Sequence, residues 1–226
     1  MNDFKLYFGL GKDHILTWEA MDHILFVAAL CLRYMLKDWK KVAVMVTAFT
    51  IGHSVTLALS ALNYVHVKRE WIEFLIPITI AVTAINNLLQ KNTEQQKKLP
   101  LIYFFALFFG LIHGLAYASS FLDLEGREGL VAHLFAFNLG IELAQLIVVA
   151  IILLVSFLLV QLLKISRLGW IRIASLTILA FSLYMAFERF PYKTITNNEK
   201  TTFMPLGNGF YVRYAFCTKH PEQSWI

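Results

Sequence analysis

The sequence predicts an all-α protein, a polytopic membrane helical bundle with about six transmembrane helices. The 226 residues are 58% hydrophobic and only 15% charged, whereas a soluble domain averages about 25% charged residues. Long apolar stretches alternate with short basic loops. With so few charges the chain cannot cover itself with a water-facing surface, so the lipid bilayer is its predicted surrounding. No nucleic-acid partner is expected, because the basic residues lie between apolar stretches and not along one helix face.

Six stretches have the length of about 20 mostly apolar residues that a helical span requires. They run approximately from Trp18 to Leu36, Lys41 to Leu62, Trp71 to Leu89, Leu99 to Leu122, Leu130 to Leu163 and Leu168 to Phe187. Thr17 is a suitable N-cap for the first, and Pro100 suits the first turn of the fourth. Pro191 blocks continuation of the last helix. We therefore predict a six-helix transmembrane domain over residues 1–190 and a tail over 191–226.

Basic residues predict the orientation of these spans. The loops that follow the first, third and fifth spans are rich in them: Arg33, Lys37, Lys40, Lys41, Lys91, Lys97, Lys98, Lys164, Arg167 and Arg172. Loops rich in Lys and Arg face the cytoplasm. Both termini are then predicted to face outward, in a bacterial inner membrane. The tail over 191–226 would be available to an outward-facing protein partner.

Polar residues of four spans fall at one predicted depth, in the outer half of the bilayer. Counted at about 1.5 Å per residue, Asp22 and His23 lie one to two turns inside the first span. His53 and His113 each lie nine residues before the outer end of their spans. Glu142 lies two to three turns below the outer end of the fifth. Ionisable groups at membrane depth are expensive and usually functional, so we expect these residues to converge.

Glycines stand beside these polar residues, at Gly52, Gly110, Gly114 and Gly140. Small residues let helices approach closely in lipid, where packing replaces the hydrophobic driving force. We therefore expect the glycines to hold the polar stripes of neighbouring helices together.

Imidazoles and carboxylates at one depth predict a site for a divalent transition metal ion. Neutral imidazole binds nickel, cobalt, zinc and copper(II) well, and carboxylates offset part of the charge of the ion. No thiolate joins these residues, which argues against a copper(I) site. His14, in the outer approach, is either a further ligand or a gate. It precedes His23 by nine residues, so both can bind only if the chain bends near Thr17.

Four stretches, GLGKDHILTWEAMDHILF, FTIGHSVTL, FGLIHGLA and FNLGIELAQ, resemble the HupE/UreJ family of membrane proteins, which are regarded as nickel or cobalt permeases. The resemblance covers most of the membrane part of the chain. It implies transport of one of these ions, and it implies that the metal-handling positions are His14, Asp22, His23, His53, His113 and Glu142.

The residues leave other interpretations open. The histidines can be interhelical hydrogen-bonding groups, and Glu142 can be a protonated structural partner. An intramembrane zinc-dependent hydrolase is the main alternative, because three histidines and an acidic residue can hold zinc and activate water. The scarcity of polar residues in the inner half favours that alternative. A third interpretation is a metal-sensing or assembly subunit whose tail docks another protein.

Overall fold

The computed structural model describes residues 3–17, 20–62, 64–65, 67–89, 99–124, 129–191, 202–206 and 210–214. Within α5 the side chains are described from Tyr103 to Ala116. The basic loop residues Lys91, Lys97 and Lys98 and most of the predicted tail lie outside the described residues. The chain divides into two units, Met1–Phe190 and Pro191–Ile226.

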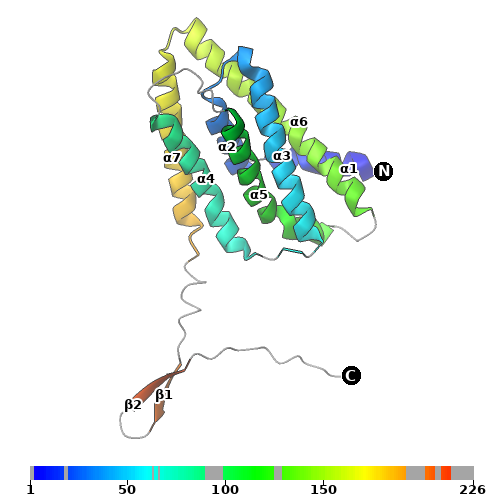
Figure 1. Ribbon diagram of the computed structural model, residues 1–226, viewed down its shortest axis with the longest axis vertical. Coiled ribbons are helices and arrows are strands. Elements are labelled where there is room, and N and C mark those ends of the chain that lie inside the picture. The colour runs from blue at the N-terminus through cyan, green and yellow to red at the C-terminus, as the bar shows by residue number, and fades with distance from the viewer. Residues whose placement is uncertain are drawn as a thin grey trace. The chain divides into compact units, whose positions relative to one another are not determined.

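The first unit is a bundle of helices (Figure 1). Its α-helices are α1 (Asp3–Leu16), α2 (Met21–Cys31), α3 (Trp39–Ala61), α4 (Arg69–Leu89), α5 (Leu99–Leu124), α6 (Leu130–Phe157) and α7 (Arg167–Glu188). A short 3-10 turn, η2 (Leu36–Asp38), precedes α3, and a π-helical turn, η3 (Leu158–Leu162), extends α6. In Figure 1, α3 ends and α4 begins at the lower end of the bundle, which the basic loops predict to face outward.

The long helices make this an integral membrane protein, and the predicted all-α polytopic bundle is confirmed. Among the described residues, four stretches are long and apolar enough to cross a bilayer: Leu36–Ala61, Arg69–Leu89, Leu130–Leu162 and Arg167–Glu188. The bent pair of α1 and α2 gives a fifth if it is counted as one span. Helix α5 has 26 residues, about 39 Å at 1.5 Å per residue, which is also enough to cross.

The first predicted span is wrong as a single straight helix. Helix α2 has only 11 residues, about 16 Å of length, which is about half of the bilayer core. Helix α1 precedes it at an angle of 70°. Thr17 is not the N-cap that the sequence predicted, because α2 begins after Ala20 without a side-chain cap. The bend near Thr17 that joint binding by His14 and His23 requires is confirmed.

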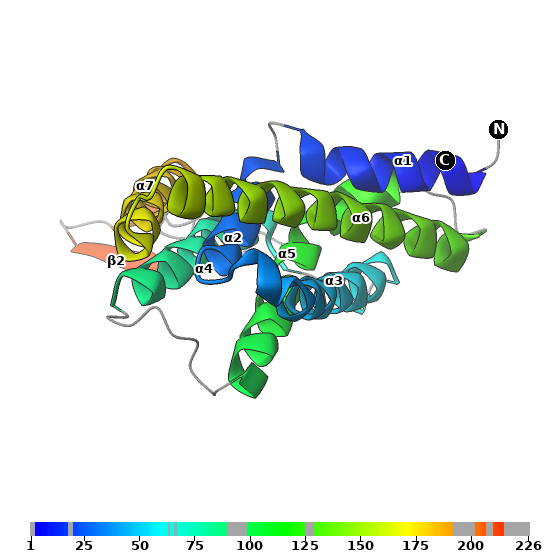
Figure 2. The ribbon, with the colours of Figure 1, turned by 90° about the horizontal axis from the view of Figure 1, so that it is seen from above.

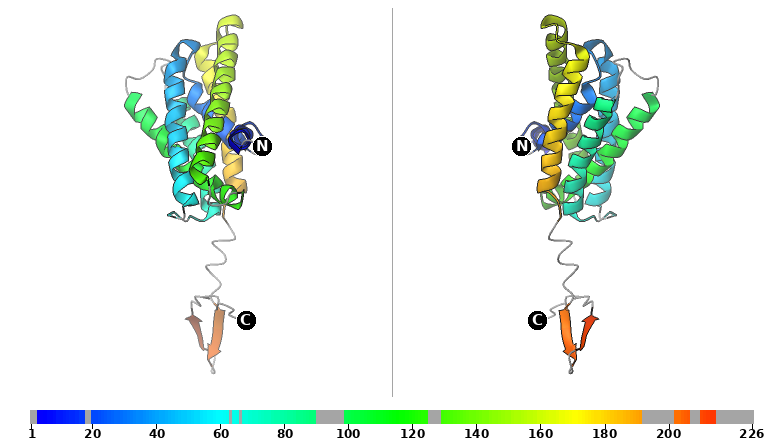
Figure 3. Two further views of the ribbon diagram at one scale, coloured as in Figure 1. Left: turned by 90° about the vertical axis from the view of Figure 1, so that its right-hand side faces the viewer. Right: turned by 90° about the vertical axis from the view of Figure 1, so that its left-hand side faces the viewer.

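Helix α1 lies across the bundle and is seen end-on when the molecule is turned (Figure 3). From above, it runs along the side of α6 that faces away from α3 (Figure 2). Glycines permit this contact. A Cβ on Gly11 would overlap the carbonyl oxygen of Phe137, and a Cβ on Gly140 would overlap that of Phe8. The backbones of α1 and α6 therefore touch at two reciprocal glycine positions.

Helices α3 and α5 make the same kind of contact. A Cβ on Gly52 would overlap the carbonyl oxygen of Leu107, and a Cβ on Gly110 would overlap that of Phe49. The expectation that glycines bring the polar stripes together is confirmed for these helix pairs, in agreement with the packing of small residues in lipid.

Hydrogen bonds between side chains and the backbone fasten the upper end of the bundle. The Asn87 amide on α4 donates to the carbonyl oxygen of Ala29 in the last turn of α2 at 2.7 Å. The Arg167 guanidinium donates to the carbonyl oxygen of Arg33 at 2.7 Å. Such bonds satisfy carbonyl groups that a helix end leaves unpaired, so α2 can end at Cys31.

The second unit contains an antiparallel hairpin. Strand β1 (Thr202–Leu206) pairs with β2 (Phe210–Tyr214), and Met204 lies opposite Val212.

The glycine contacts generate a prediction about stability. We expect Gly110→Ala to lower the free energy of unfolding by about 1–3 kcal/mol, because the added methyl group forces α5 away from the backbone of α3. Thermal unfolding of the purified protein in detergent measures this. Gly9→Ala is the control, since a Cβ on Gly9 meets nothing within 4 Å. Equal unfolding temperatures for the two variants would contradict the assigned contact.

Candidate metal centre

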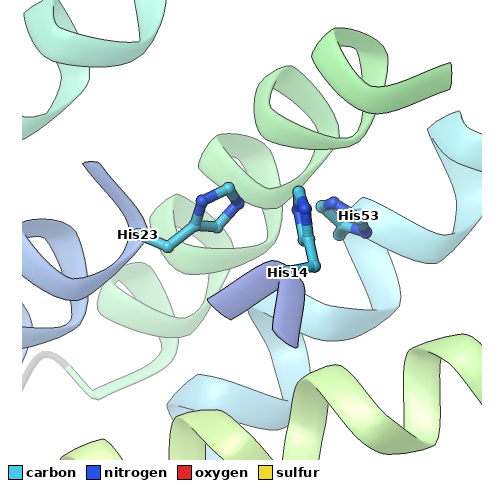
Figure 4. Close-up of side chains that lie close together, drawn as sticks. All are labelled: His14, His23 and His53. Atoms are coloured by element: carbon cyan, nitrogen blue, oxygen red, sulfur yellow. The ribbon is translucent and has the colours of Figure 1, made fainter. Parts of the chain in front are cut away.

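Three histidines from three different helices converge in the bundle. His14 on α1, His23 on α2 and His53 on α3 each offer one ring nitrogen, and these nitrogens all lie within 4.8 Å of one another. The ring centroids of His14 and His23 are 4.9 Å apart, and those of His14 and His53 are 6.0 Å apart. Figure 4 shows the three side chains directed toward one another from their separate helices. We call this group the histidine cluster.

The orientation of His23 is set by its neighbour in the sequence. The Asp22 Oδ1 atom accepts from the backbone N–H of His23 at 2.9 Å and lies 3.1 Å from Nδ1 of the ring. A carboxylate oxygen only accepts, so the proton of a neutral ring sits on Nδ1. The lone pair is then on Nε2, as in metal-binding histidines whose other nitrogen donates to a carboxylate.

The second oxygen of Asp22 is also engaged. The Arg189 guanidinium, beyond the end of α7, donates through Nη1 to Asp22 Oδ2 at 3.1 Å. Asp22 is buried, with 7% of its surface exposed. An unpaired buried carboxylate is costly, and Arg189 supplies the opposite charge. The predicted role of Asp22 as a direct ligand stays a prediction, and its described contacts suit a residue that orients a ligand.

His113 on α5 lies against the cluster without belonging to it. Its ring centroid is 5.0 Å from that of His23, and the ring packs on Phe26 and Phe49 at 5.3 and 5.1 Å. The residue is 1% exposed. It is therefore adjacent to the histidine cluster, beside the ring of His23.

Several buried ring nitrogens around the cluster have no partner in hydrogen-bonding geometry among the described residues. They are Nε2 of His23 and both ring nitrogens of His113. The two ring nitrogens of His53 are also buried. Asn138 on α6 is near enough for a side-chain hydrogen bond to one of them, which leaves the other available. A buried polar group without a partner costs about 1–3 kcal/mol, and such groups are rare in folded proteins. Their concentration at one place suits a site that receives a ligand.

A layer of phenylalanine rings lies one helical turn above the histidines, on the side of the upper end. The centroid of Phe26 is 5.1 Å from that of Phe49 and 5.5 Å from that of Phe109. Each ring is three or four residues from a histidine of its own helix, in the pairs Phe26 with His23, Phe49 with His53 and Phe109 with His113. This layer was not predicted from the sequence, although the recurring one-turn spacing between Phe and His could have indicated it.

A cavity of about 360 Å³ reaches the cluster. Its lining residues come from α1, α2, α4 and α5 and from the segments that follow α1, precede α2 and follow α7: His14, Thr17, Ala20, Asp22, His23, Arg69, Glu73, Ile76, His113, Ala116 and Arg189. Arg69 and Glu73 belong to the first turns of α4, at the lower end of the bundle. The cavity therefore connects His14, His23 and His113 with the predicted outer side, whereas the phenylalanine layer covers the side toward the upper end.

Glu142 lies elsewhere, in the seam between α3 and α6. The Thr47 hydroxyl donates to its carboxylate at 2.6 Å. Next to this pair, the Thr50 hydroxyl donates to Oε1 of the fully buried Gln145 at 2.9 Å. Glu142 is not among the described residues whose ligand atoms converge, so the structure does not bring it into the cluster. Its predicted metal-handling role stays a prediction.

The donor set of the cluster suits a divalent transition ion. Metal–nitrogen bonds measure about 2.0–2.1 Å, so two nitrogens on one tetrahedral ion are about 3.3–3.4 Å apart. The nitrogens of the cluster lie within 4.8 Å of one another, so the rings need to close by up to about 1.5 Å to share an ion. Three neutral imidazoles are a donor set that suits nickel, cobalt or zinc.

Comparison with protein families matches residues 1–189 to the family described as HupE / UreJ protein. Comparisons with curated proteins and with solved structures give no match.

The position of His14 generates a prediction about binding. We expect Gly11→Ala to weaken cobalt(II) binding by about tenfold, a loss of the size seen when the support of a ligand is removed. The added methyl group would displace α1 from α6 and withdraw His14 from the other two rings. Titration of the purified protein with cobalt(II), followed by visible absorption, measures the change.

Gly9→Ala on the same helix is the matched control and should bind as the wild type does. If Gly11→Ala bound cobalt(II) normally while His14→Ala did not, docking of α1 through Gly11 would not be what positions His14.

Proposed function

The chain belongs to the HupE/UreJ family, and from this premise together with the histidine cluster we propose that it is a permease for a divalent transition metal ion, nickel or cobalt. The single observation that carries the proposal is the group of buried imidazole nitrogens of His23 and His113, which line a polar cavity and have no hydrogen-bond partner among the residues that the structure describes. A merely structural set of histidines would donate to or accept from neighbouring groups.

In the proposed mechanism the ion enters the cavity from outside. The three imidazoles of the histidine cluster then replace water molecules that the ion had bound. His23 binds through Nε2, which Asp22 leaves free. His14 closes the site from the side of α1, and His113 provides an alternative nitrogen. Exchange among several ligands keeps any one site from binding too tightly for release.

Passage inward requires the phenylalanine layer to move. The seam between α3 and α6 offers oxygen atoms joined in two cross-helix hydrogen bonds: Thr50 with Gln145 at the level of that layer, and Thr47 with Glu142 beyond it. Thr47, the partner of Glu142, precedes His53 by six residues on α3, which is about 9 Å along the helix. We propose Glu142 as a second station on the inward route.

The intramembrane zinc-dependent hydrolase is the second candidate, and one observation favours it. Three histidines with open positions toward a cavity resemble a catalytic zinc site, in which a water molecule takes the remaining position. The oxygen-lined seam, which continues past the phenylalanine layer to Thr47 and Glu142, favours transport instead, because a fixed catalytic site has no use for a second polar station.

The surroundings of the membrane unit follow from the same proposal. We place the protein in a bacterial inner membrane with both termini outward, as the basic loops indicate. The second unit, Pro191–Ile226, would then face outward, where a protein partner could bind it.

The proposal predicts metal uptake that depends on the cluster. Vesicles that contain the wild-type protein should accumulate radioactive nickel or cobalt, and His23→Ala or His53→Ala should lower the initial rate by at least about tenfold, because each removes a ligand of the ion. His133→Gln is the matched control, since His133 stacks on Tyr7 at 4.2 Å and is not part of the cluster.

Wild-type rates in the two cluster variants would overturn the proposed site. Cluster-dependent metal binding without any uptake, accompanied by hydrolysis of a membrane substrate, would support the hydrolase instead.

Metal binding should also become weaker as the pH falls. The ion binds neutral imidazole, so protons compete for the same nitrogens, and the affinity should fall by about tenfold per pH unit for each proton that the ion displaces. Cobalt(II) titrations from neutral pH down to the pH at which the metal-free histidines take up protons measure this dependence. An affinity that did not change even at a pH that protonates the metal-free histidines would argue against imidazole ligands.

A further inference from the structure

An ion pair joins the end of α7 to the start of α2 across the cavity. Arg189 and Asp22 are separated by 167 residues in the sequence, yet Nη1 and Oδ2 lie 3.1 Å apart. Both residues line the cavity. The side chain of Asp22 is 9% exposed and that of Arg189 is 29% exposed, so the pair is much less screened by solvent than a surface salt bridge.

A chain of contacts leads from Arg189 to the histidine cluster. Arg189 holds one oxygen of Asp22, and the other oxygen holds Nδ1 of His23. A carboxylate with one oxygen unpaired could rotate toward the cavity or toward an arriving cation. The ring of His23 would then lose the acceptor that keeps its proton on Nδ1, and a proton on Nε2 would block that nitrogen as a ligand.

We propose that Arg189 is a positioning residue of the metal site, which acts through Asp22 to keep Nε2 of His23 directed at the ion. The inference rests on the proposed metal-binding function and adds a residue from the end of α7, a helix that contributes no histidine to the cluster. Arg189 would also have a second effect: its positive charge would hold the carboxylate of Asp22 away from direct coordination of the ion.

A second arginine in the same cavity provides the comparison. Arg69 pairs with Glu73 at 2.6 Å on α4, and its side chain is 59% exposed. Arg69 shares the cavity and the charge of Arg189 but contacts neither Asp22 nor His23 in the described structure. A general effect of positive charge on the approaching cation would therefore be similar for both arginines, whereas a positioning effect belongs to Arg189 alone.

The test compares Arg189→Gln, Arg189→Lys and Arg69→Gln in the full-length protein. Cobalt(II) alone is the probe, and its affinity is measured by visible absorption. We expect Arg189→Gln to weaken binding by about three- to tenfold, at or below the lower end of the losses seen for groups that orient metal ligands. Arg189→Lys should recover part of the loss, because it keeps the charge but not the planar fork. Arg69→Gln should bind as the wild type does.

A double-mutant cycle asks whether Arg189 acts through Asp22. If it does, Arg189→Gln should change the affinity by less than about twofold when Asp22→Asn is already present. An equal loss in both backgrounds would overturn the inference, since it would show an effect that does not pass through the carboxylate.

One readout needs no metal. Nitrogen NMR of histidine-labelled, metal-free protein, with His23 assigned by His23→Gln, reports which ring nitrogen carries the proton. We expect Nδ1–H in the wild type and in Arg69→Gln, and a mixture in Arg189→Gln. An unchanged tautomer in Arg189→Gln would overturn the inference. Absence of cobalt(II) binding by the wild type would count against the proposed function, and the NMR result would still decide the role of Arg189.

Discussion

Close contact between helix backbones is the constraint on which the rest of this structure depends. Within lipid, helices associate by packing and not by the hydrophobic effect, and the glycines of α1, α3, α5 and α6 remove the side chains that would hold these helices apart. Gly11 and Gly140 bring α1 onto α6, so that His14 reaches His23 and His53. Larger residues at these positions would separate the rings beyond the reach of one ion.

The histidines then share a site with two unlike faces. Toward the lower end they meet a polar cavity in which acidic and basic side chains are paired. Toward the upper end they meet the rings of Phe26 and Phe49, which are almost fully buried. Water and ions can approach from the polar face, whereas the aromatic face has a low dielectric constant that strengthens electrostatic interactions with a bound ion. The asymmetry fits a site loaded from one side.

Much of this could be predicted from the sequence, and the exceptions have physical causes. The number of residues along each span predicted that His23, His53 and His113 lie at one membrane depth, because the rise per residue of a helix is fixed. The pairing of Glu142 with Thr47 could not be predicted in this way, since the depth of a residue does not specify which helix face its side chain occupies. The short α2 was also missed. The length of an apolar run does not show where α2 ends, because the end depends on another helix: Asn87 on α4 satisfies a carbonyl group in the last turn of α2.

The sequence by itself determined the membrane class, the bundle of helices and the set of residues able to bind a metal ion, because composition and apolar length are properties of the chain alone. Only the tertiary structure decided which of them meet. It joined His14, His23 and His53, paired Glu142 with Thr47, and brought Arg189 to Asp22. These contacts depend on helix crossings and on a bend of 70°, which arise from packing between segments that are remote in the sequence.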